Sequence, residues 1–161
     1  MDRYFEKIGF EQFKKDVVDD LNIYNEYKLP ERKTKYSAGY DFFAIEDFEL
    51  KPGEIKKIPT GIKANFLFDE YLMIVVRSSM GFKYNVRMTN QVGIIDSDYY
   101  NNSDNEGHIW ISLENHGNEV FKVEKGNGIC QGIFNKYLTT SDNVNEIRTG
   151  GFGSTDGKEE N

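Results

Sequence analysis

The sequence predicts an all-β protein with the architecture of a sandwich or barrel, and three observations support this fold class. Short runs of β-branched and aromatic residues recur along the chain between turn signals: "GIKANFLF", "YLMIVVR", "HIWISLEN", "EVFKVE" and "GICQGIFNKY". The segment "KPGE" at 51–54 suits a type II turn, because proline stands second and glycine third. The chain has 161 residues, the length of one domain with its own hydrophobic core. Many short strands with regular turns are typical of a sandwich or barrel.

Residues 1–21 are predicted to form an N-terminal amphipathic helix that precedes the β domain. Apolar residues stand three to five positions apart in this segment, with charges between them, which is the spacing of one helix face: Phe5, Ile8, Phe13, Val17 and Leu21. We expect this face to dock on the β domain, which the change in sequence pattern places at residues 22–138.

Residues 139–161 are predicted to form a flexible carboxyl-terminal arm. From Thr139 the chain is polar and poor in bulky apolar residues until Phe152, so it has little to bury. Within this arm, "RTGGFGSTDG" at 148–157 combines glycine amides, hydroxyls and an arginine, which suit an anion, with a phenylalanine that offers a flat apolar face. A disordered linker is the alternative, since glycine- and serine-rich ends usually have that role.

Composition excludes several classes of function. The formal net charge is −7, which argues against sequence-independent binding to nucleic acid, because such binding depends on clustered lysine and arginine. We expect no membrane partner and a cytoplasmic protein, since no apolar run reaches signal-peptide length or the roughly 20 residues of a membrane span. The single cysteine, Cys130, cannot form an internal disulfide, and His108 and His116 lack partners at metal-ligand spacing.

Asp96 in "GIIDSDYY" (93–100) is a candidate general base. It follows two β-branched residues, so a strand would deliver its carboxylate to an edge or cleft, where it could deprotonate a water. The alternative is that Asp96 and Asp98 only begin a solvated loop, and the residues alone favour that simpler interpretation. A calcium site in the following "NNSDNEG" is excluded, because the terminal bidentate acid of an EF-hand loop is missing and no flanking helix pair is visible.

Two further motifs place polar groups next to strands. "RSSMG" (77–81) follows the apolar run "YLMIVV" and combines one arginine with two hydroxyls, a set that suits phosphate oxygens. "KGNGICQG" (125–132) enters a strand with Gln131 among apolar neighbours, where it could orient a water or a phosphate oxygen. The alternatives are a salt-bridged surface arginine and a glutamine on the solvent face of the strand. Cys130 is interpreted as a small core residue rather than a nucleophile.

The order of these motifs resembles that of a known family. "SAGYDFFA", "RSSMG", "NQVGIIDSDYY", "KGNGICQ" and "RTGGFGSTD" resemble the five ordered motifs of the trimeric dUTPases, and the similarity runs from about Leu29 to Gly157. The resemblance implies a distorted jelly-roll or β-barrel subunit in a homotrimer with shared active sites. It also implies hydrolysis of dUTP to dUMP and pyrophosphate with Mg²⁺, which keeps uracil out of DNA and supplies dUMP for thymidylate synthesis.

The resemblance assigns roles in the reaction. It implies that Asp96 orients and deprotonates the attacking water, with Gln131 close to that water. Asp41 in "AGYD" would contact waters of the magnesium ion. The phosphate oxygens would be held by a set of cationic and polar residues: Arg77, Ser78, Ser79, Gln131, Arg148, Ser154 and Thr155.

The resemblance also assigns a nucleoside pocket, formed by Asn90, Gly93, Ile95, Tyr99 and Phe152. Tyr99 would pack against the deoxyribose and leave no room for a 2′-hydroxyl, while Asn90 and nearby backbone would read the uracil edge. Phe152 would stack on uracil as part of a lid that orders when substrate is present.

One departure from the family pattern follows Tyr99, where "YNNSDNEG" (100–107) replaces a short turn, and Gly107 is predicted to be the turn glycine. This insertion could offer a docking surface to a regulatory protein. Two other functions stay open: a dCTP deaminase of the same fold, and a nucleotide-sensing or partner-binding protein without turnover. Asp96 and the lid motif favour dUTP hydrolysis over deamination, and the retention of Asp96, Gln131 and Arg148 argues against an inactive protein.

Overall fold

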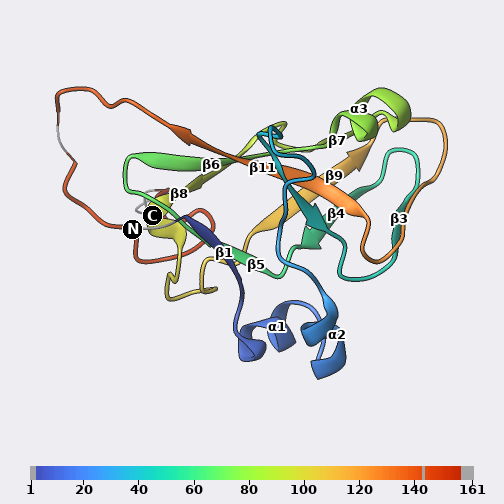
Figure 1. Ribbon diagram of the computed structural model, residues 1–161, viewed down its shortest axis with the longest axis horizontal. Coiled ribbons are helices and arrows are strands. Elements are labelled where there is room, and N and C mark those ends of the chain that lie inside the picture. Colours follow the sequence, from blue (N-terminus) through green and yellow to red (C-terminus); the bar gives the residue numbers. More distant parts are fainter. Residues whose placement is uncertain (1–2, 143, 157–161) are drawn as a thin grey trace, which may run out of the picture.

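A computed structural model describes residues 3–142 and 144–156 (Figure 1). Strands dominate it: β1 (Tyr4–Lys7), β2 (Tyr40–Phe43), β3 (Phe48–Leu50), β4 (Ile55–Pro59), β5 (Ile62–Asn65), β6 (Glu70–Val75), β7 (Val86–Met88), β8 (Gly93–Asp96), β9 (Trp110–Asn115), β10 (Phe121–Val123) and β11 (Gly128–Lys136). The helices are short: α1 (Phe10–Asp16), α2 (Leu21–Glu26), α3 (Ser78–Tyr84) and the 3₁₀ turn η1 (Ser97–Tyr99). Within the described ranges, no helix is long and apolar enough to cross a membrane.

The predicted all-β class is confirmed, and each apolar run quoted above overlaps one strand, namely β5, β6, β9, β10 or β11. The predicted turn between β3 and β4 also forms, since Gly53 has a φ of 79° and the Glu54 N–H donates to the Lys51 carbonyl over 2.9 Å. A positive φ at the third position is what a type II turn requires of its glycine.

Antiparallel pairing organises the strands into two main sheets. One has the order β2-β11-β6-β8 and the other the order β4-β9-β7, while β1 pairs with β5 and β3 with β10. The chain crosses from one main sheet to the other between β7 and β8, because β7 pairs with β9 whereas β8 pairs with β6. This crossing positions the site described below.

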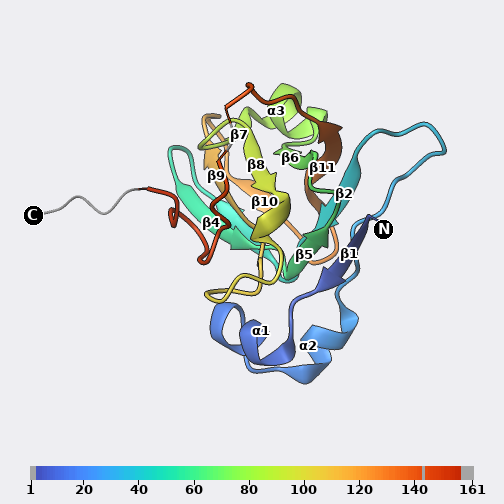
Figure 2. The same cartoon turned by 90° about the vertical axis from the view of Figure 1, so that its left-hand side faces the viewer.

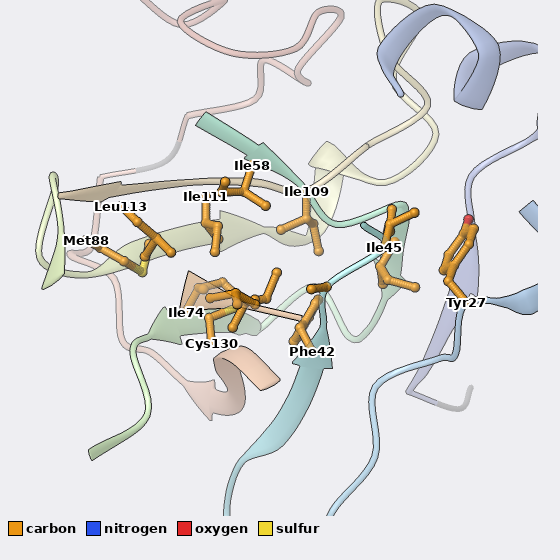
Figure 3. Packing of buried hydrophobic residues seen from close by; sticks show 14 of the residues in the cluster. Tyr27, Phe42, Ile45, Ile58, Ile74, Met88, Ile109, Ile111, Leu113 and Cys130 are labelled. Atoms are coloured by element: carbon orange, nitrogen blue, oxygen red, sulfur yellow. The ribbon is translucent and has the colours of Figure 1, made fainter. Parts of the chain in front are cut away.

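The core lies between the two main sheets (Figure 3). Ile111 and Leu113 of β9 point toward Ile74 of β6 and Cys130 of β11, and each of the four is at most 2 % exposed. Burial alternates along β9, as expected for a strand with one face on the core. Burial also raises the pKa of the Cys130 thiol, so this residue is the small core residue that the sequence predicted.

The predicted helix over residues 1–21 is wrong in its extent. Residues 1 and 2 lie outside the described residues, Tyr4–Lys7 forms strand β1, and Phe10–Asp16 is the helical part of that stretch. The ring of Phe5 accounts for the strand, because it packs against Phe42 and Phe134 with centroids 5.5 and 5.4 Å apart. The pairing of β1 with β5 and the packing of the Phe5 ring therefore prevailed over the helical spacing of the apolar residues.

The expected docking of this segment on the β domain is confirmed. Strand β1 extends β5, and α1 and α2 lie together at one end of the β domain (Figures 1 and 2). Ile8 and Phe13 are fully buried in the same core as the sheets. Asp20 is the N-cap of α2, because its carboxylate accepts hydrogen bonds from the N–H groups of Asn22 and Ile23. Aspartate is among the residues most favoured at this position.

Candidate functional site

A pocket of about 700 Å³ opens where the chain crosses from β7 to β8. Both main sheets and the carboxyl-terminal segment contribute to its mostly apolar wall: Lys57, Ile74, Met88, Thr89, Asn90, Gly93, Ile94, Ile95, Asn105, Trp110, Ile111, Ser112 and Phe152. Four of the five residues predicted to hold a nucleoside, Asn90, Gly93, Ile95 and Phe152, line this pocket. An apolar cavity with a few polar groups is the usual form of a small-molecule site.

The β7–β8 connection is a tight turn that determines the shape of the pocket. The Gln91 N–H donates to the Met88 carbonyl over 2.9 Å, and Gln91 has a φ of 62°, in the left-handed region. Gly93 starts β8 opposite Ile74, and a Cβ at this position would lie 3.2 Å from the Cβ of Ile74. Glycine at 93 therefore lets β8 approach β6 closely beneath the pocket.

Asp96 ends β8 on the side of the pocket. It pairs with Tyr71 at the start of β6, and its side chain is 55 % exposed at the edge of a smaller pocket of about 330 Å³. This second pocket shares four lining residues with the first: Ile94, Ile95, Trp110 and Phe152. A carboxylate at the end of a strand that lines a pocket can act on a water bound there.

Tyr99 is the fifth predicted nucleoside residue, and it lines the smaller pocket. Its phenol donates to the His108 carbonyl over 2.7 Å and accepts from Asn105 Nδ2 over 2.9 Å. Burial is the main cause that raises the pKa of this phenol. The ring is thus fixed through its hydroxyl, which suits a residue that shapes one wall of a binding site.

The carboxyl-terminal segment lies against this site. Arg148 donates from Nη2 to Asp96 Oδ2 over 3.0 Å and from Nε to Asp98 Oδ1 over 3.2 Å, and its guanidinium lies 5.8 Å from the centroid of the Tyr99 ring. Arg148 Nη1 also donates to Ser154 Oγ over 3.3 Å. Of the arm predicted at 139–161, residues 143 and 157–161 lie outside the described residues.

The tip of this segment contributes to both pockets. Phe152 lines both of them while 88 % of its surface is exposed, and Thr155 lines the smaller one. An exposed aromatic ring at the mouth of an apolar pocket can stack on a flat ligand. The lid motif therefore lies beside Asp96 and Tyr99 in this structure.

A second cluster contains the other predicted phosphate and metal residues. Asp41 of β2 is 8 % exposed, and its carboxylate lies 3.2 Å from Nε of Arg77 and 3.8 Å from Nζ of Lys33. Gln131 of β11 pairs with Asp41 and donates to the Val76 carbonyl over 3.3 Å. These contacts bring a carboxylate, a guanidinium and an amide together at one end of the sheet.

The "RSSMG" motif forms the start of a short helix and not the end of a strand. Arg77 is the N-cap residue of α3, so Ser78 and Ser79 form the exposed first turn of a short helix. Gly128 gives Arg77 room, because a Cβ at 128 would lie 2.5 Å from Nη1 of Arg77. The glycine in the fourth motif thus allows the arginine of the second motif to lie close to strand β11.

The two clusters do not meet within one chain. Asp96 pairs with Tyr71 and Gln131 pairs with Val75, so the clusters flank opposite ends of β6. Four residues of antiparallel strand separate these positions, which corresponds to about 13 Å along β6. The structure therefore brings Asp96 together with Tyr99, Arg148 and Phe152, but not with Asp41, Arg77 and Gln131.

Sequence analysis missed Trp110 and Asn105, which both line the large pocket. Trp110 is the single tryptophan of the chain and occupies the outward face of β9, whose inward positions carry Ile111 and Leu113. A large aromatic residue on the outward face of an alternating strand was an available signal. Asn105 lies in the insertion, and its sequence context gave no indication of a pocket.

The two histidines have carboxylate partners. Buried His108 lies with Nδ1 2.6 Å from Asp16 Oδ2, and its Nε2 accepts from the Gly61 N–H over 2.9 Å, so Nδ1 carries the proton. His116 lies 2.8 Å from Glu114 at the surface. Burial lowers the pKa of the His108 imidazole, while Asp16 acts in the opposite direction.

Comparison with known proteins identifies the family. A family model for dUTPase matches residues 25–156. The deoxyuridine 5′-triphosphate nucleotidohydrolase of Lactococcus lactis is 45 % identical over 150 residues, covering 91 % of this chain and 96 % of that protein. The crystal structure of dUTPase from Streptococcus mutans is similar with a TM-score of 0.69 and 36 % identity, covering 86 % of this chain and 98 % of that chain.

A more distant structure shares the fold. A dUTPase from phage phi11 of Staphylococcus aureus, in which the coordination of a structural Mg(II) ion is described, is 18 % identical with a TM-score of 0.66. The alignment covers 91 % of this chain and 98 % of that one. Since the family model and the Lactococcus relative both span most of the sequence, the chain belongs to the dUTPase family.

Proposed function

We propose that this chain hydrolyses dUTP to dUMP and pyrophosphate as a cytoplasmic homotrimer that uses Mg²⁺, and that Asp96 is the general base. The geometry of β8 supports the assignment of Asp96 as the general base. One strand lines the pocket with Gly93 and Ile95 and then ends at Asp96, so a nucleotide whose base fills the pocket extends its phosphates past that carboxylate.

The pocket suits a flat base joined to a deoxyribose. Phe152 and Trp110 provide aromatic surface, while Asn90 and the backbone of the β7–β8 turn provide polar groups. Buried polar groups that stay unpaired discriminate strongly against a ligand with the wrong donors and acceptors. The ring of Tyr99 packs against the sugar in this proposal, and close packing there rejects a 2′-hydroxyl.

The chemical step is an attack of water on the α-phosphorus. Asp96 takes one proton from the water as the water oxygen bonds to phosphorus, and the bond between the α-phosphorus and the bridging oxygen breaks to release pyrophosphate. Arg77, Ser78, Ser79 and Gln131 hold phosphate oxygens, and Gln131 also orients the water. Positioning and charge stabilisation account for most of the catalysis in such reactions.

The lid residues complete the phosphate site. Arg148, Ser154 and Thr155 bind the γ-phosphate when Arg148 exchanges its contact with Asp98 for phosphate oxygens. Phosphate oxygens offer the guanidinium charge-assisted hydrogen bonds in place of that ion pair, in which the Arg148 side chain is 11 % exposed and the Asp98 side chain 39 %. Phe152 covers the uracil in the same movement, so the segment excludes water from both ends of the nucleotide.

The residues around Asp41 fit a magnesium ion that the substrate phosphates help to hold. Asp41 already has two cationic neighbours, and the described residues contain no group of three or more His, Cys, Asp or Glu side chains that could hold a metal ion. Mg²⁺ usually keeps several waters and binds through one or two carboxylates plus phosphates, so contact through water suits Asp41. The bound ion would supply neutralisation of charge on the triphosphate.

The separation of the two clusters supports sites shared between subunits. Asp96 and Gln131 flank opposite ends of β6, about 13 Å apart along a strand, while both act on one triphosphate in this proposal. A second copy of the chain can place its phosphate residues beside the Asp96 of the first. In a closed ring of three copies, each heterologous contact would produce one such site.

The first experiment measures pyrophosphate release from dUTP, dCTP, dTTP and UTP with and without Mg²⁺, with Asp96→Asn beside the wild type. The proposal requires magnesium-dependent release from dUTP alone, and its loss in the variant. Ammonia release from dCTP would instead identify a deaminase. A folded protein that binds dUTP without releasing pyrophosphate would identify a nucleotide sensor.

A mixing experiment tests shared sites. Asp96→Asn impairs the first cluster, and Arg77→Ala impairs the second. Each variant alone is therefore expected to be inactive. Unfolding and refolding the two variants together should restore a measurable fraction of the wild-type rate, because some sites then combine two intact clusters. No recovery from well-folded mixed oligomers would contradict the shared site.

A further inference from the structure

The phenol of Tyr99 is held by two hydrogen bonds. Its oxygen donates to the His108 carbonyl over 2.7 Å and accepts from Asn105 Nδ2 over 2.9 Å. A phenol has one proton to donate, so the His108 carbonyl determines where that proton points. In the insertion at 100–107, the Asn102 amide donates to the Tyr99 carbonyl over 2.8 Å and to Asn105 Oδ1 over 2.9 Å. Tyr99 is therefore fixed both at its hydroxyl and at its backbone.

The His108 carbonyl is held by the chain on both sides of it. The Ile109 N–H, which shares a peptide plane with this carbonyl, donates to the Ile62 carbonyl over 2.9 Å. On the preceding side, the His108 N–H donates to the Asn105 carbonyl over 3.0 Å. These bonds fix the backbone before and after His108, while the side chain of His108 fixes the Cα between them.

The imidazole of His108 is fully buried and has one partner on each nitrogen. Its Nδ1 donates to Asp16 Oδ2 over 2.6 Å, and its Nε2 accepts from the Gly61 N–H over 2.9 Å. The ring also packs against Trp110, with centroids 5.1 Å apart. Both nitrogens are satisfied in this one orientation, so a rotation of the ring would leave a buried polar group without a partner.

Asp16 contacts this imidazole from α1, which lies next to the 100–107 loop (Figure 2). Phe13, one turn earlier in the helix, is fully buried in the core and so fixes α1 against the β domain. The Gln12 amide donates over 2.9 Å to the same oxygen of Asp16 that His108 contacts. The carboxylate is therefore held in place by its own helix and directed at the imidazole.

We propose that Asp16 and His108 are positioning residues for Tyr99 and thereby favour deoxyribonucleotides over ribonucleotides. Asp16 holds the His108 imidazole, and the carbonyl of His108 holds the Tyr99 phenol. Because Tyr99 excludes a 2′-hydroxyl by close packing, a small displacement of its ring would admit UTP. The inference rests on the proposed function, and it gives the amino-terminal segment a role in substrate selection.

The ratio of kcat/KM for dUTP to kcat/KM for UTP tests this positioning. Asp16→Ala should lower the ratio about fivefold, the order expected for one weakened hydrogen bond. Both nucleotides are assayed on the same sample, so the folded fraction of the protein cancels in the ratio. A role of Asp16 in stability alone would lower both rates equally and leave the ratio unchanged, which would contradict the proposal.

Two further substitutions at position 16 separate the acceptor from the volume of the side chain. Asp16→Asn keeps an acceptor oxygen and should restore most of the wild-type ratio. Asp16→Leu keeps a branched side chain without an acceptor, so it should lower the ratio as Asp16→Ala does, and it takes the place of that variant if alanine prevents folding. A wild-type ratio in folded Asp16→Leu would overturn the proposal.

Glu11→Ala is the matched control, because Glu11 is an exposed acid of the same helix that pairs with Lys14. This variant should keep the wild-type ratio. A ratio lowered as far as in Asp16→Ala would mean that any change in α1 has this effect, and it would rule out a specific role of Asp16.

Tyr99→Phe removes the phenol on which Asp16 acts in this proposal. The variant should lower the ratio at least as much as Asp16→Ala does. The variant that carries both substitutions should lose no more than Tyr99→Phe alone, because the two residues act along one path. A double variant in which the two losses multiply would show independent effects and would overturn the proposal.

Urea unfolding tests the connection without any nucleotide. The loss of unfolding free energy in the variant with both Asp16→Ala and Tyr99→Phe should be smaller than the sum of the two single losses. Additive losses would show that the two residues are not connected. Since this measurement needs no turnover, it decides the connection even if the wild type releases no pyrophosphate and the proposed function fails.

Discussion

The guanidinium of Arg148 reaches the carboxylate of Asp96, with Nη2 and Oδ2 3.0 Å apart. The contact joins the lid motif to the proposed general base, which are separated by 52 positions along the chain. Arg148 also contacts Asp98, Ser154 and the Tyr99 ring. Arg148 therefore connects the lid motif to several side chains around Asp96.

Asp96→Asn should lower kcat about 10³-fold, the size of effect that general-base catalysis usually has. The affinity for dUTP should stay within about threefold, since asparagine has nearly the same shape. Pyrophosphate release measures the first quantity, and fluorescence of Trp110 in the pocket measures the second. Asp98→Asn, which removes the other ion pair of Arg148, serves as the control and should retain turnover; an equal loss there would point to the ion pairs rather than to the base.

Phe152→Ala should weaken binding of a non-hydrolysable dUTP analogue by about 1–3 kcal/mol, the usual contribution of an aromatic side chain stacked on a base. Titration of Trp110 fluorescence gives the dissociation constant. Ile147→Ala is the matched control, because Ile147 is an exposed apolar residue of the same segment that lines neither pocket. Equal affinities of the wild type and Phe152→Ala would exclude stacking.

Chelation of Mg²⁺ with EDTA should abolish pyrophosphate release, and added Mg²⁺ should restore it. Asp41→Asn should raise the Mg²⁺ concentration for half-maximal rate about tenfold, because a neutral amide attracts the hydrated ion less than a carboxylate does. Lys33→Ala, which removes the weaker cationic neighbour of Asp41, is the control. An unchanged requirement in Asp41→Asn would remove this residue from the metal site.

Gly107→Ala should destabilise the fold more than Gly126→Ala. Both glycines have a φ of 83°, but a Cβ at 107 would lie 2.7 Å from the Tyr99 carbonyl oxygen, whereas a Cβ at 126 meets nothing within 4 Å. The left-handed conformation alone costs alanine about 1–2 kcal/mol, and the contact at 107 adds to this. Urea unfolding of both variants measures the difference, and equal losses would show that the close contact relaxes freely.

Acidification should destabilise the protein through His108. Its pKa is lowered by burial, so folding favours the neutral ring, and this stability is present above the ordinary histidine pKa of 6.5 and lost as the pH falls through the lower value in the fold. Glu106 and Asp16 oppose the shift without reversing it. The free energy of unfolding should therefore decrease from pH 7 to pH 5, and less so in His108→Gln. Parallel pH profiles would contradict this role.

Much of the fold was predictable because local patterns and burial agree. Alternating apolar runs became strands, and Gly53 adopted the turn that its neighbours indicated. The amino-terminal segment was not predictable in the same way. The spacing of Phe5 and Ile8 is compatible with a helix, whereas the pairing of β1 with β5 and the ring contacts of Phe5 favour a strand.

The candidate site was predictable where a motif places a side chain at the end of a strand. Asp96 ends strand β8, as "GIID" indicated, and this strand lines the pocket. Asn105 was not predictable, because its contacts with Tyr99 and the carboxyl-terminal segment depend on how the insertion folds around Asn102. The roles assigned to individual residues stay predictions until the variants are measured.

The buried contact between His108 and Asp16 connects the amino-terminal segment to Tyr99, which lines the smaller pocket. Asp16 of α1 contacts the His108 imidazole, and the backbone carbonyl of His108 accepts a hydrogen bond from the Tyr99 phenol. Asp16 is therefore connected to the proposed sugar site through His108. We therefore expect positions 16 and 108 to covary. Across related sequences, an acid corresponding to position 16 and a histidine corresponding to position 108 should be inherited or replaced together.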